Sequence, residues 1–447
     1  MQETHSSAAP RAQSARLVLW TLLFVYILNF LDRQIVNILA EPIKQDLGLS
    51  DTEIGLMTGL AFALFYTVLG IPIARYADNP KTSRTMLISV SLAFWSGMTA
   101  LCGLAQNFGQ LLLARIGVGV GEAGCTPAAH SLISDTVPAE KRSSAMAFYG
   151  LGIPIGSLLG MAMGGLLADA YGWRVAFLVA GLPGVLMALA LPMLIREPRR
   201  HRPSTIPDEA PLANLPGAAE AVPAASPTAL PAREALREIL RSKAMVQLLI
   251  AAGLVAFLAY GKTVWATIFF IRTHGLSPGE TGLWLGISAG LAAMAGTWLG
   301  GWIADRYGAR DPRHIVTAPA LGLVVGAPIL FFGYAAADWR LGLVLIVTAT
   351  LLNSFYYGPT YACVQGLVRP QARAMATAVM LFTQNLIGLG LGPLFFGMLS
   401  DAFAPVAGAE SVRWVLFGAA WLGLIPAFFF WRARAHLGKE LARPGGR

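Results

Sequence analysis

The sequence predicts an all-α polytopic membrane protein with twelve transmembrane helices arranged in two halves of six. Of its 447 residues, 55% are apolar and only 13% are charged, whereas soluble globular proteins carry about 25% charged residues. Apolar stretches of about 20 residues, the length that crosses the hydrocarbon core of a bilayer, recur along the whole chain. A proline-rich polar segment divides these stretches into two sets of six.

The order of apolar and polar stretches predicts five regions. The predicted transmembrane spans are residues 16–38, 53–76, 85–105, 108–133, 143–168, 174–195, 244–271, 281–304, 315–335, 341–364, 373–399 and 412–431. Between the two sets, eight prolines predict a flexible linker, with a short amphipathic helix at 233–241. The regions are an N-terminal tail (1–15), a six-helix bundle (16–195), the linker (196–242), a second six-helix bundle (243–432) and a C-terminal tail (433–447).

The positions of Lys and Arg predict the orientation in the membrane. Of the 33 Lys and Arg residues, 25 lie in the two termini and in the connections on the same side as the termini. Five lie on the opposite side, and three (Arg33, Arg115 and Lys262) lie well inside predicted spans, away from the span ends. Because cytoplasmic loops are enriched in these residues, we expect both termini and the linker in the cytoplasm, with the protein in a bacterial inner membrane. The net charge of +9 then reflects topology, and no nucleic-acid partner is expected.

The sequence contains no recognisable motif for catalysis, for metal binding or for ATP binding. The three cysteines (Cys102, Cys125 and Cys363) lie in apolar spans without the spacing of metal ligands. No phosphate-binding Gly-Lys-Ser/Thr loop is present, so ATP is not expected to drive transport. We therefore predict a protein that is not an enzyme and has no catalytic residue, metal or cofactor.

Four charged residues lie inside the first and fourth predicted spans, where an ionisable side chain requires a physical reason. Asp32 and Arg33 are in the first span, and Arg115 and Glu122 are in the fourth. A separation of seven residues places Arg115 and Glu122 on one helix face, about 10 Å apart along the axis. A carboxylate that takes up a proton releases its hold on a neighbouring arginine, which couples protons to conformation or to an anionic substrate. The alternative is a permanent ion-pair network that only fixes the two helices together.

Polar residues in the second half predict the rest of a substrate cavity. Lys262 lies near the middle of its span, between Tyr260 and Trp265. It is predicted to face the cavity, with snorkelling or packing as the alternative. The other predicted lining residues are Asn353, Tyr357, Gln384 and Asn385.

A weak internal repeat follows the second and the eighth predicted spans. The segment Gly301–Arg310 fits the pattern G-x-x-x-D-R-x-G-x-R, and the segment Ala74–Arg84 keeps the acidic residue and the trailing basic residues. We expect both to control the closure of the cytoplasmic face, and the alternative is that they are plain topology signals. The predicted gating residues are Asp78, Lys81, Arg84, Gly301, Asp305, Arg306, Gly308 and Arg310.

Two six-helix halves, a central linker and this loop pattern resemble the major facilitator superfamily over nearly the whole chain. The resemblance implies parallel halves, a central substrate site, alternating access by rocking and a monomer. It also implies contacts between the second and eleventh helices and between the fifth and eighth. The i+4 glycines suit such sliding contacts, with static packing as the alternative. These glycines are Gly152, Gly156, Gly160 and Gly164, and the pairs Gly55/Gly59, Gly286/Gly290, Gly296/Gly300 and Gly388/Gly392.

A series of motifs in the N-terminal half resembles the Spinster branch, whose animal members export sphingosine-1-phosphate or lysophospholipids. The series is Asn29-x-x-Asp32-Arg33, Gly121-Glu122-Ala123 with Pro127, Ile133-Ser-Asp135, Arg142, Phe148-Tyr149 and Ile153-Pro154-x-Gly156-Ser157. The resemblance implies that Asp32 is the proton-linked carboxylate, that Arg115 and Glu122 are its partners, and that Arg33 lies near the substrate head group. It also places Asn29 and Tyr149 at the substrate site.

The predicted function is secondary active transport, coupled to protons, of an amphiphilic or organic anion that resembles a lysolipid. One alternative is a proton symporter for a small organic acid or sugar acid. The other is a membrane sensor that transports nothing.

Overall fold

A computed structural model describes residues 14–138, 141–198 and 231–441, and within these residues the chain is helical and has no strand. Most of the predicted linker, at 199–230, lies outside the described residues. The helices before it are α1 (Ala15–Leu47), α2 (Asp51–Gly55), α3 (Ala61–Asp78), α4 (Arg84–Cys102), α5 (Phe108–Glu122), α6 (Cys125–Thr136), α7 (Arg142–Gly150), α8 (Gly152–Tyr171) and α9 (Trp173–Leu194).

The second half begins with α10, the short helix expected before the first span of this half. Its helices are α10 (Ala232–Arg241), α11 (Lys243–His274), α12 (Pro278–Gly308), α13 (Thr317–Ala335), α14 (Trp339–Asn353), α15 (Tyr357–Gly366), α16 (Arg373–Thr383), α17 (Gly392–Ala407), α18 (Ser411–Leu422) and α19 (Leu424–Leu441). Two π-helical segments, η1 (Leu56–Leu60) and η8 (Gln384–Leu391), join α2 to α3 and α16 to α17. The first lies near the beginning of the second predicted span, and the other lies in the middle of the eleventh.

Ten helical stretches in the described part of the chain are long and apolar enough to cross a membrane. One of them, Pro370–Leu441, has 72 residues and contains two of the predicted spans. The predicted span 108–133 is not among the ten because it is divided into α5 and α6, of 15 and 12 residues. Ten stretches, one of which contains two predicted spans, together with the divided span, account for the twelve predicted spans.

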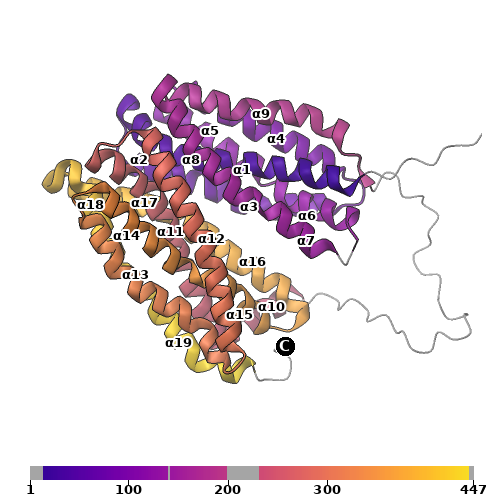
Figure 1. Cartoon of the computed structure of the whole chain (residues 1–447). Helices are drawn as coiled ribbons and strands as arrows, with labels where there is room; N and C mark the ends of the chain where they lie inside the picture. The colour runs from indigo at the N-terminus through magenta and orange to yellow at the C-terminus, as the bar shows by residue number, and fades with distance from the viewer. Residues whose placement is uncertain (1–13, 139–140, 199–230, 442–447) are drawn as a thin grey trace, which may run out of the picture.

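The two halves form separate helical bundles that meet at one end and diverge toward the other (Figure 1). They meet where α2, α8 and α17 lie, and we call this the joined end. They diverge toward α6 and α7 of the first bundle and α15 and α16 of the second, and we call this the open end.

The glycine stripe of α8 packs inside its own half, which corrects the expectation that it faces the other half. A Cβ atom added to Gly156 would lie 2.3 Å from the backbone oxygen of Ile27 in α1. The contact between α8 and α12 does exist, but Gly165 makes it, since its added Cβ would lie 2.3 Å from the Pro278 oxygen. The i+4 spacing identifies a packing face, but it does not identify the helix that packs there.

Candidate functional site

The four charges predicted inside the N-terminal half lie together between α1 and α5. Asp32, Arg115 and Glu122 are each at most 1% exposed. The Arg33 Nε atom donates a hydrogen bond of 2.6 Å to Glu122 Oε2. The sequence-predicted cluster therefore exists, with Glu122 bonded to Arg33.

Three aromatic rings surround the guanidinium of Arg33, and sequence reasoning missed all three. Its Cζ atom lies 5.1 Å from the ring centre of Phe30, 4.9 Å from that of Phe62 and 4.5 Å from that of Tyr66. The ring centre of Phe62 is also 5.4 Å from Arg115 Cζ. Phe62 thus contacts both arginines, and its π-face attracts each cation.

Asp32 is enclosed differently from Glu122. Thr99 and Trp95 of α4 are near its carboxylate, and the charges of Glu122 and Arg115 act on it. Within the described residues, neither Asp32 oxygen completes a hydrogen bond, and the same holds for Arg115 Nε and Nη1. The cluster thus combines the ion pair of Arg33 and Glu122 with a buried carboxylate, Asp32, and a buried arginine, Arg115, and within the described residues these last two form no ion pair with each other.

A cavity of about 420 Å³ lies mostly inside the C-terminal half. Its wall comes from α11 to α15, and the N-terminal half adds Gln34, Ser157 and Met161. Three of the predicted lining residues are in the wall: Lys262, Asn353 and Tyr357. Lys262 is the only charged residue that lines the cavity, and within the described residues no carboxylate forms an ion pair with it.

Four of the nine residues that bring a hydroxyl group to the cavity wall donate it to a carbonyl of their own helix. Thr263 and Thr350 each donate a bond of 2.8 Å to the carbonyl one turn earlier, and Ser354 donates to Thr350 in the same way. These hydroxyls have no donor left for a ligand. The donors that remain in the wall include the Lys262 ammonium, the amides of Gln34 and Asn353, and tyrosine hydroxyl groups.

The other predicted lining residues lie outside the cavity wall. Gln384 is buried in η8, where its Oε1 accepts a bond of 3.2 Å from the Tyr361 hydroxyl. Asn385 is half-buried in the same segment. Tyr149 is buried in α7 and stacks on Tyr26 at a centroid distance of 4.2 Å, and Asn29 is buried near Glu122.

Arg84, one of the predicted gating residues, is fully buried and bonded inside the N-terminal half. Its guanidinium donates to Glu197 Oε1 at 2.7 Å, to Asp135 Oδ2 at 2.7 Å and to Ser131 Oγ at 2.9 Å. It therefore ties the start of α4 to α6 and to the segment after α9. Sequence reasoning missed Glu197 because it is 113 residues away from Arg84.

The remaining predicted gating residues lie at the open end. Asp78, Lys81, Asp305, Arg306 and Arg310 are all exposed. Gly301 is half-buried in α12, and Gly308 packs against Ile315. Among the described residues, no ion pair joins any of these charges to the opposite bundle, as expected where the bundles diverge. Their gating role stays a prediction.

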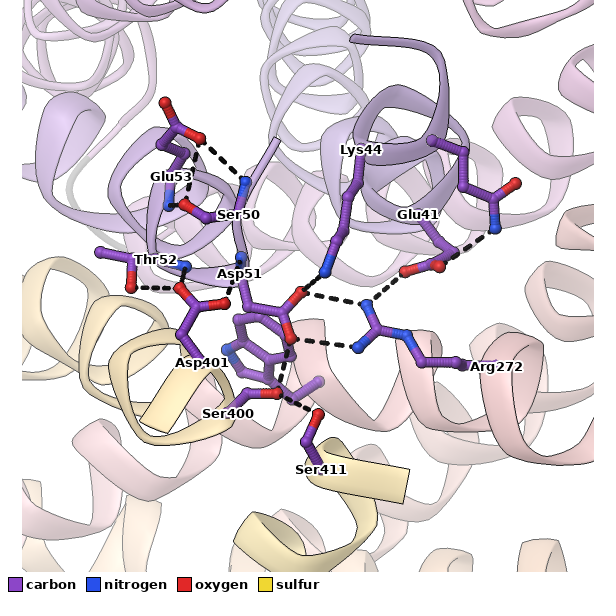
Figure 2. Close-up of polar contacts among 12 residues, drawn as sticks. Glu41, Lys44, Ser50, Asp51, Thr52, Glu53, Arg272, Ser400, Asp401 and Ser411 are labelled. Carbon is purple, nitrogen blue, oxygen red and sulfur yellow. Dashed lines mark hydrogen bonds and ion pairs between the residues drawn. The ribbon is translucent and has the colours of Figure 1, made fainter. Parts of the chain in front are cut away.

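A second charged cluster, at the joined end, was not predicted (Figure 2). Arg272 of α11 donates to both oxygens of Asp51 at 3.0 Å and to Glu41 Oε2 at 2.7 Å. Lys44 also donates to Asp51, and Ser400 of α17 donates to Asp51 Oδ2 at 2.5 Å. In the sequence, Lys44 and Arg272 are two of the five basic residues on the side opposite the termini, and they were used only to predict the orientation in the membrane. Each lies close to an acidic residue or to a helix end.

Comparisons with known proteins agree with this architecture. The sequence profile of the Major Facilitator Superfamily matches residues 22–393. An MFS-type efflux pump of Mycolicibacterium smegmatis is 32% identical over 421 residues, which are 94% of this chain and 92% of the relative. Protein spinster homolog 1 of Homo sapiens is 29% identical over 402 residues, which are 86% of this chain and 73% of the relative.

A solved structure is similar over almost the entire fold. It is a bacterial homolog of the human lysosomal transporter Spinster, in an inward-facing and unoccupied conformation. The TM-score is 0.83 at 31% sequence identity, and the match covers 96% of this chain and 99% of that chain. The divergence of the two bundles toward one end is therefore a known arrangement of this fold.

Proposed function

The chain belongs to the Major Facilitator Superfamily and resembles its Spinster branch, and from this premise we propose that it is a proton-coupled transporter of amphiphilic organic anions. The observation that carries the proposal is the cavity in the C-terminal half, with one unpaired cation in a largely apolar wall. An anionic head group would pair with Lys262, and an apolar chain would lie along the wall. Transport would proceed by alternating access of a single copy of the chain.

The chemistry of the wall favours an amphiphile over a sugar acid. A sugar acid presents many hydroxyl oxygens, each of which needs a donor or an acceptor once it is out of water. The wall hydroxyls of Thr263, Thr350 and Ser354 already donate to backbone carbonyls. One strong cation in a largely apolar wall suits a ligand with one charged group and a long apolar part.

The N-terminal charge cluster supports coupling to protons. Glu122 holds Arg33 through the bond from Nε, so a proton on Glu122 would weaken this bond and change where the Arg33 guanidinium is held. Asp32 is buried close to Glu122 and Arg115, so a proton on either carboxylate alters the charge that the other experiences. We propose Asp32 as the coupling carboxylate and Glu122 as its partner.

The distribution of Lys and Arg supports an orientation with the open end toward the cytoplasm of a bacterium. The connections rich in Lys and Arg, such as the one that holds Lys81 and Arg84, lie at the open end, and basic residues favour the cytoplasmic side. The cavity would then be accessible from the cytoplasm in this conformation.

The experiment is a pH-jump assay on purified protein in liposomes, with lysophospholipids, sphingoid phosphates and small organic acids as candidate substrates. We expect lysolipid transport that depends on the pH gradient, and loss of that dependence in Asp32→Asn. Coupling of proton and substrate binding is typically a 5–150-fold effect, and Asp32→Asn should remove it. Asp338→Asn, at an exposed helix cap, is the matched control and should keep the full pH response.

The screen separates the proposal from its alternatives. Transport confined to small acids would make the protein an organic-acid or sugar-acid symporter. Absence of any transport, with ligand-dependent changes in conformation, would make it a sensor. An unchanged pH profile in Asp32→Asn would exclude the coupling role of this residue.

A further inference from the structure

The joined end is built from two copies of the same pair of sequence elements. The first element, G-L-S-x-x-E-x-G-L, occurs at 48–56 in the N-terminal half and at 275–283 in the C-terminal half. The second element, G-x-L-x-D, occurs at 165–169 in α8 and at 397–401 in α17. Each half therefore carries one copy of both elements, which allows a contact to be formed twice between the same two halves.

In each half the first element ends one helix and begins the next by the same chemistry. Gly48 and Gly275 have φ angles of +67° and +68°, a backbone conformation that glycine adopts without strain. They end α1 and α11 as left-handed C-caps. The serine and glutamate that follow then form a capping box at the start of α2 and of α12.

The first interlock joins α2 of the N-terminal half to α17 of the C-terminal half. Asp401 Oδ1 accepts from the Asp51 backbone N–H at 3.0 Å, and its Oδ2 accepts from the Thr52 N–H at 2.7 Å. These N–H groups belong to the first turn of α2, which has no earlier carbonyl to bond. The carboxylate from one half thus caps a helix of the other half (Figure 2).

The second interlock joins α12 of the C-terminal half to α8 of the N-terminal half, and it reverses the roles. Asp169 Oδ2 accepts from the Gly279 backbone N–H at 2.9 Å and from the Ser277 hydroxyl at 2.6 Å. Asp169 and Asp401 occupy the same position of the G-x-L-x-D element. The two caps are therefore equivalent under exchange of the halves.

Glycines of both elements let the backbones touch at each interlock. An added Cβ on Gly397 would lie 2.3 Å from the Asp51 oxygen, and one on Gly165 would lie 2.3 Å from the Pro278 oxygen. In the other direction, an added Cβ on Gly282 would lie 2.2 Å from the Met161 oxygen. Any side chain at these positions would push the two halves apart.

The interlocks differ in charge. The first contains the buried cluster in which Arg272 bonds Asp51 and Glu41. In the second, Pro278 stands where the first has Asp51, and Gln45 stands where the C-terminal half has Arg272. Only the first interlock therefore adds an ion-pair cluster that joins α1 and α2 to α11 of the other half.

We propose that these two interlocks are the gate that holds the joined end shut, with Asp401 and Asp169 as its paired helix-capping residues and Arg272 as the ionic lock of the first. The gate lies at the opposite end from the predicted gating loops, and Asp401, Asp169 and Arg272 do not line the cavity. When the halves rock, both caps break together, because each bonds one half to the other. The fraction of molecules that are open at the joined end then depends on the stability of the interlocks. This fraction can be measured without knowing the substrate.

The experiment measures the separation of the halves with spin labels at Gln106→Cys and Ala337→Cys, two exposed positions in joined-end loops of opposite halves. The natural cysteines are buried, so they compete little for the label. We expect Asp401→Ala and Asp169→Ala each to raise the ratio of separated to joined molecules about fivefold, the effect of losing one helix cap. Arg272→Gln should raise it about tenfold or more, because Glu41 and Asp51 remain buried without the guanidinium.

Two controls remove the same kinds of bond as the variants, but their bonds stay within one half. Asp338→Ala removes a helix cap at the same end, but this cap bonds the Arg340 N–H within one half. Arg174→Gln removes an arginine that pairs with Asp46 within the N-terminal half. Both controls should leave the distance distribution as it is in the parent protein.

If Asp401→Ala and Asp169→Ala match Asp338→Ala in this distribution, the gate is excluded. A shift in only one of the two would refute the paired arrangement, and an effect of Arg272→Gln no larger than that of Arg174→Gln would refute the ionic lock. Asp401→Asn keeps one of the two oxygens that accept the backbone bonds, and it loses the charge and the second acceptor. It should give a smaller shift than Asp401→Ala, and it serves as the test if the alanine variant does not fold.

Discussion

The two halves of the molecule treat their buried charges in opposite ways. The N-terminal half gathers Asp32, Arg33, Arg115 and Glu122 into one cluster and bonds Arg33 to Glu122. The C-terminal half places Lys262 alone in the wall of a cavity. A cluster of opposite charges can change its pairing when it gains a proton, whereas an unpaired cation is free to bind an anion. The difference indicates that one half serves coupling and the other serves the substrate.

The largest effect on stability is expected in the N-terminal half, at Arg84. Arg84→Met leaves Glu197 buried and removes its guanidinium partner. Breaking a buried ion pair in this way costs about 3–5 kcal/mol, so the melting temperature of the purified protein should fall by several degrees. Arg75→Met, an exposed arginine of α3, is the control. Equal melting temperatures of the two variants would contradict the role assigned to Arg84.

A smaller effect, on binding instead of stability, is expected in the C-terminal half at Lys262. Lys262→Met keeps the length of the side chain and removes the only charge of the cavity wall. Loss of a charged hydrogen bond corresponds to about 1.5–3 kcal/mol, or roughly 10–100-fold in substrate affinity, measured by scintillation proximity or calorimetry. Lys243→Met, at the exposed start of the same helix, should bind as the parent does. If the substrate is neutral and both variants bind it equally, Lys262 does not bind the substrate. The proposal that the C-terminal half binds the substrate through this cation would then be wrong.

The three aromatic rings around Arg33 sharpen the comparison. Among the described residues, no aromatic ring makes such a contact with Lys262 in the C-terminal half. Phe62→Leu removes the ring that contacts both Arg33 and Arg115. A buried cation–π contact is worth about 0.5–2 kcal/mol. We therefore expect lower thermal stability than in Phe177→Leu, a buried phenylalanine of the same half. Equal losses in the two variants would show that the ring only fills space.

Periodicity and hydropathy predict the parts of the site that depend on a single helix. The spacing of Arg115 and Glu122 places both on one face of α5, and the depth of Lys262 in its span predicts that it faces the cavity. Contacts between distant segments are different, because no local pattern specifies the partner. Glu197 for Arg84, α1 for the glycine stripe of α8, and Asp401 for the start of α2 all depend on how helices assemble. The repeated G-L-S-x-x-E-x-G-L element was a usable signal, since its recurrence in both halves marks equivalent helix starts.

The smallest effect is expected at the surface of the C-terminal half, where Glu238 of α10 pairs with Arg369 before α16. Partial burial opposes ionisation of Glu238, but hydrogen bonds from the Arg369 backbone N–H and Nε, both 2.9 Å, outweigh it and hold the pKa of this carboxyl below its usual value. A lowered pKa contributes stability that is present above the unfolded value of about 4.3 and is lost as the pH falls through the folded value. Because the arginine is exposed, Glu238→Gln should lower the melting temperature at pH 7 by less than about 2 °C. The difference from the parent should shrink as the pH falls below about 4.3, and a difference that stays constant would mean that Glu238 stabilises α10 by packing and not by charge.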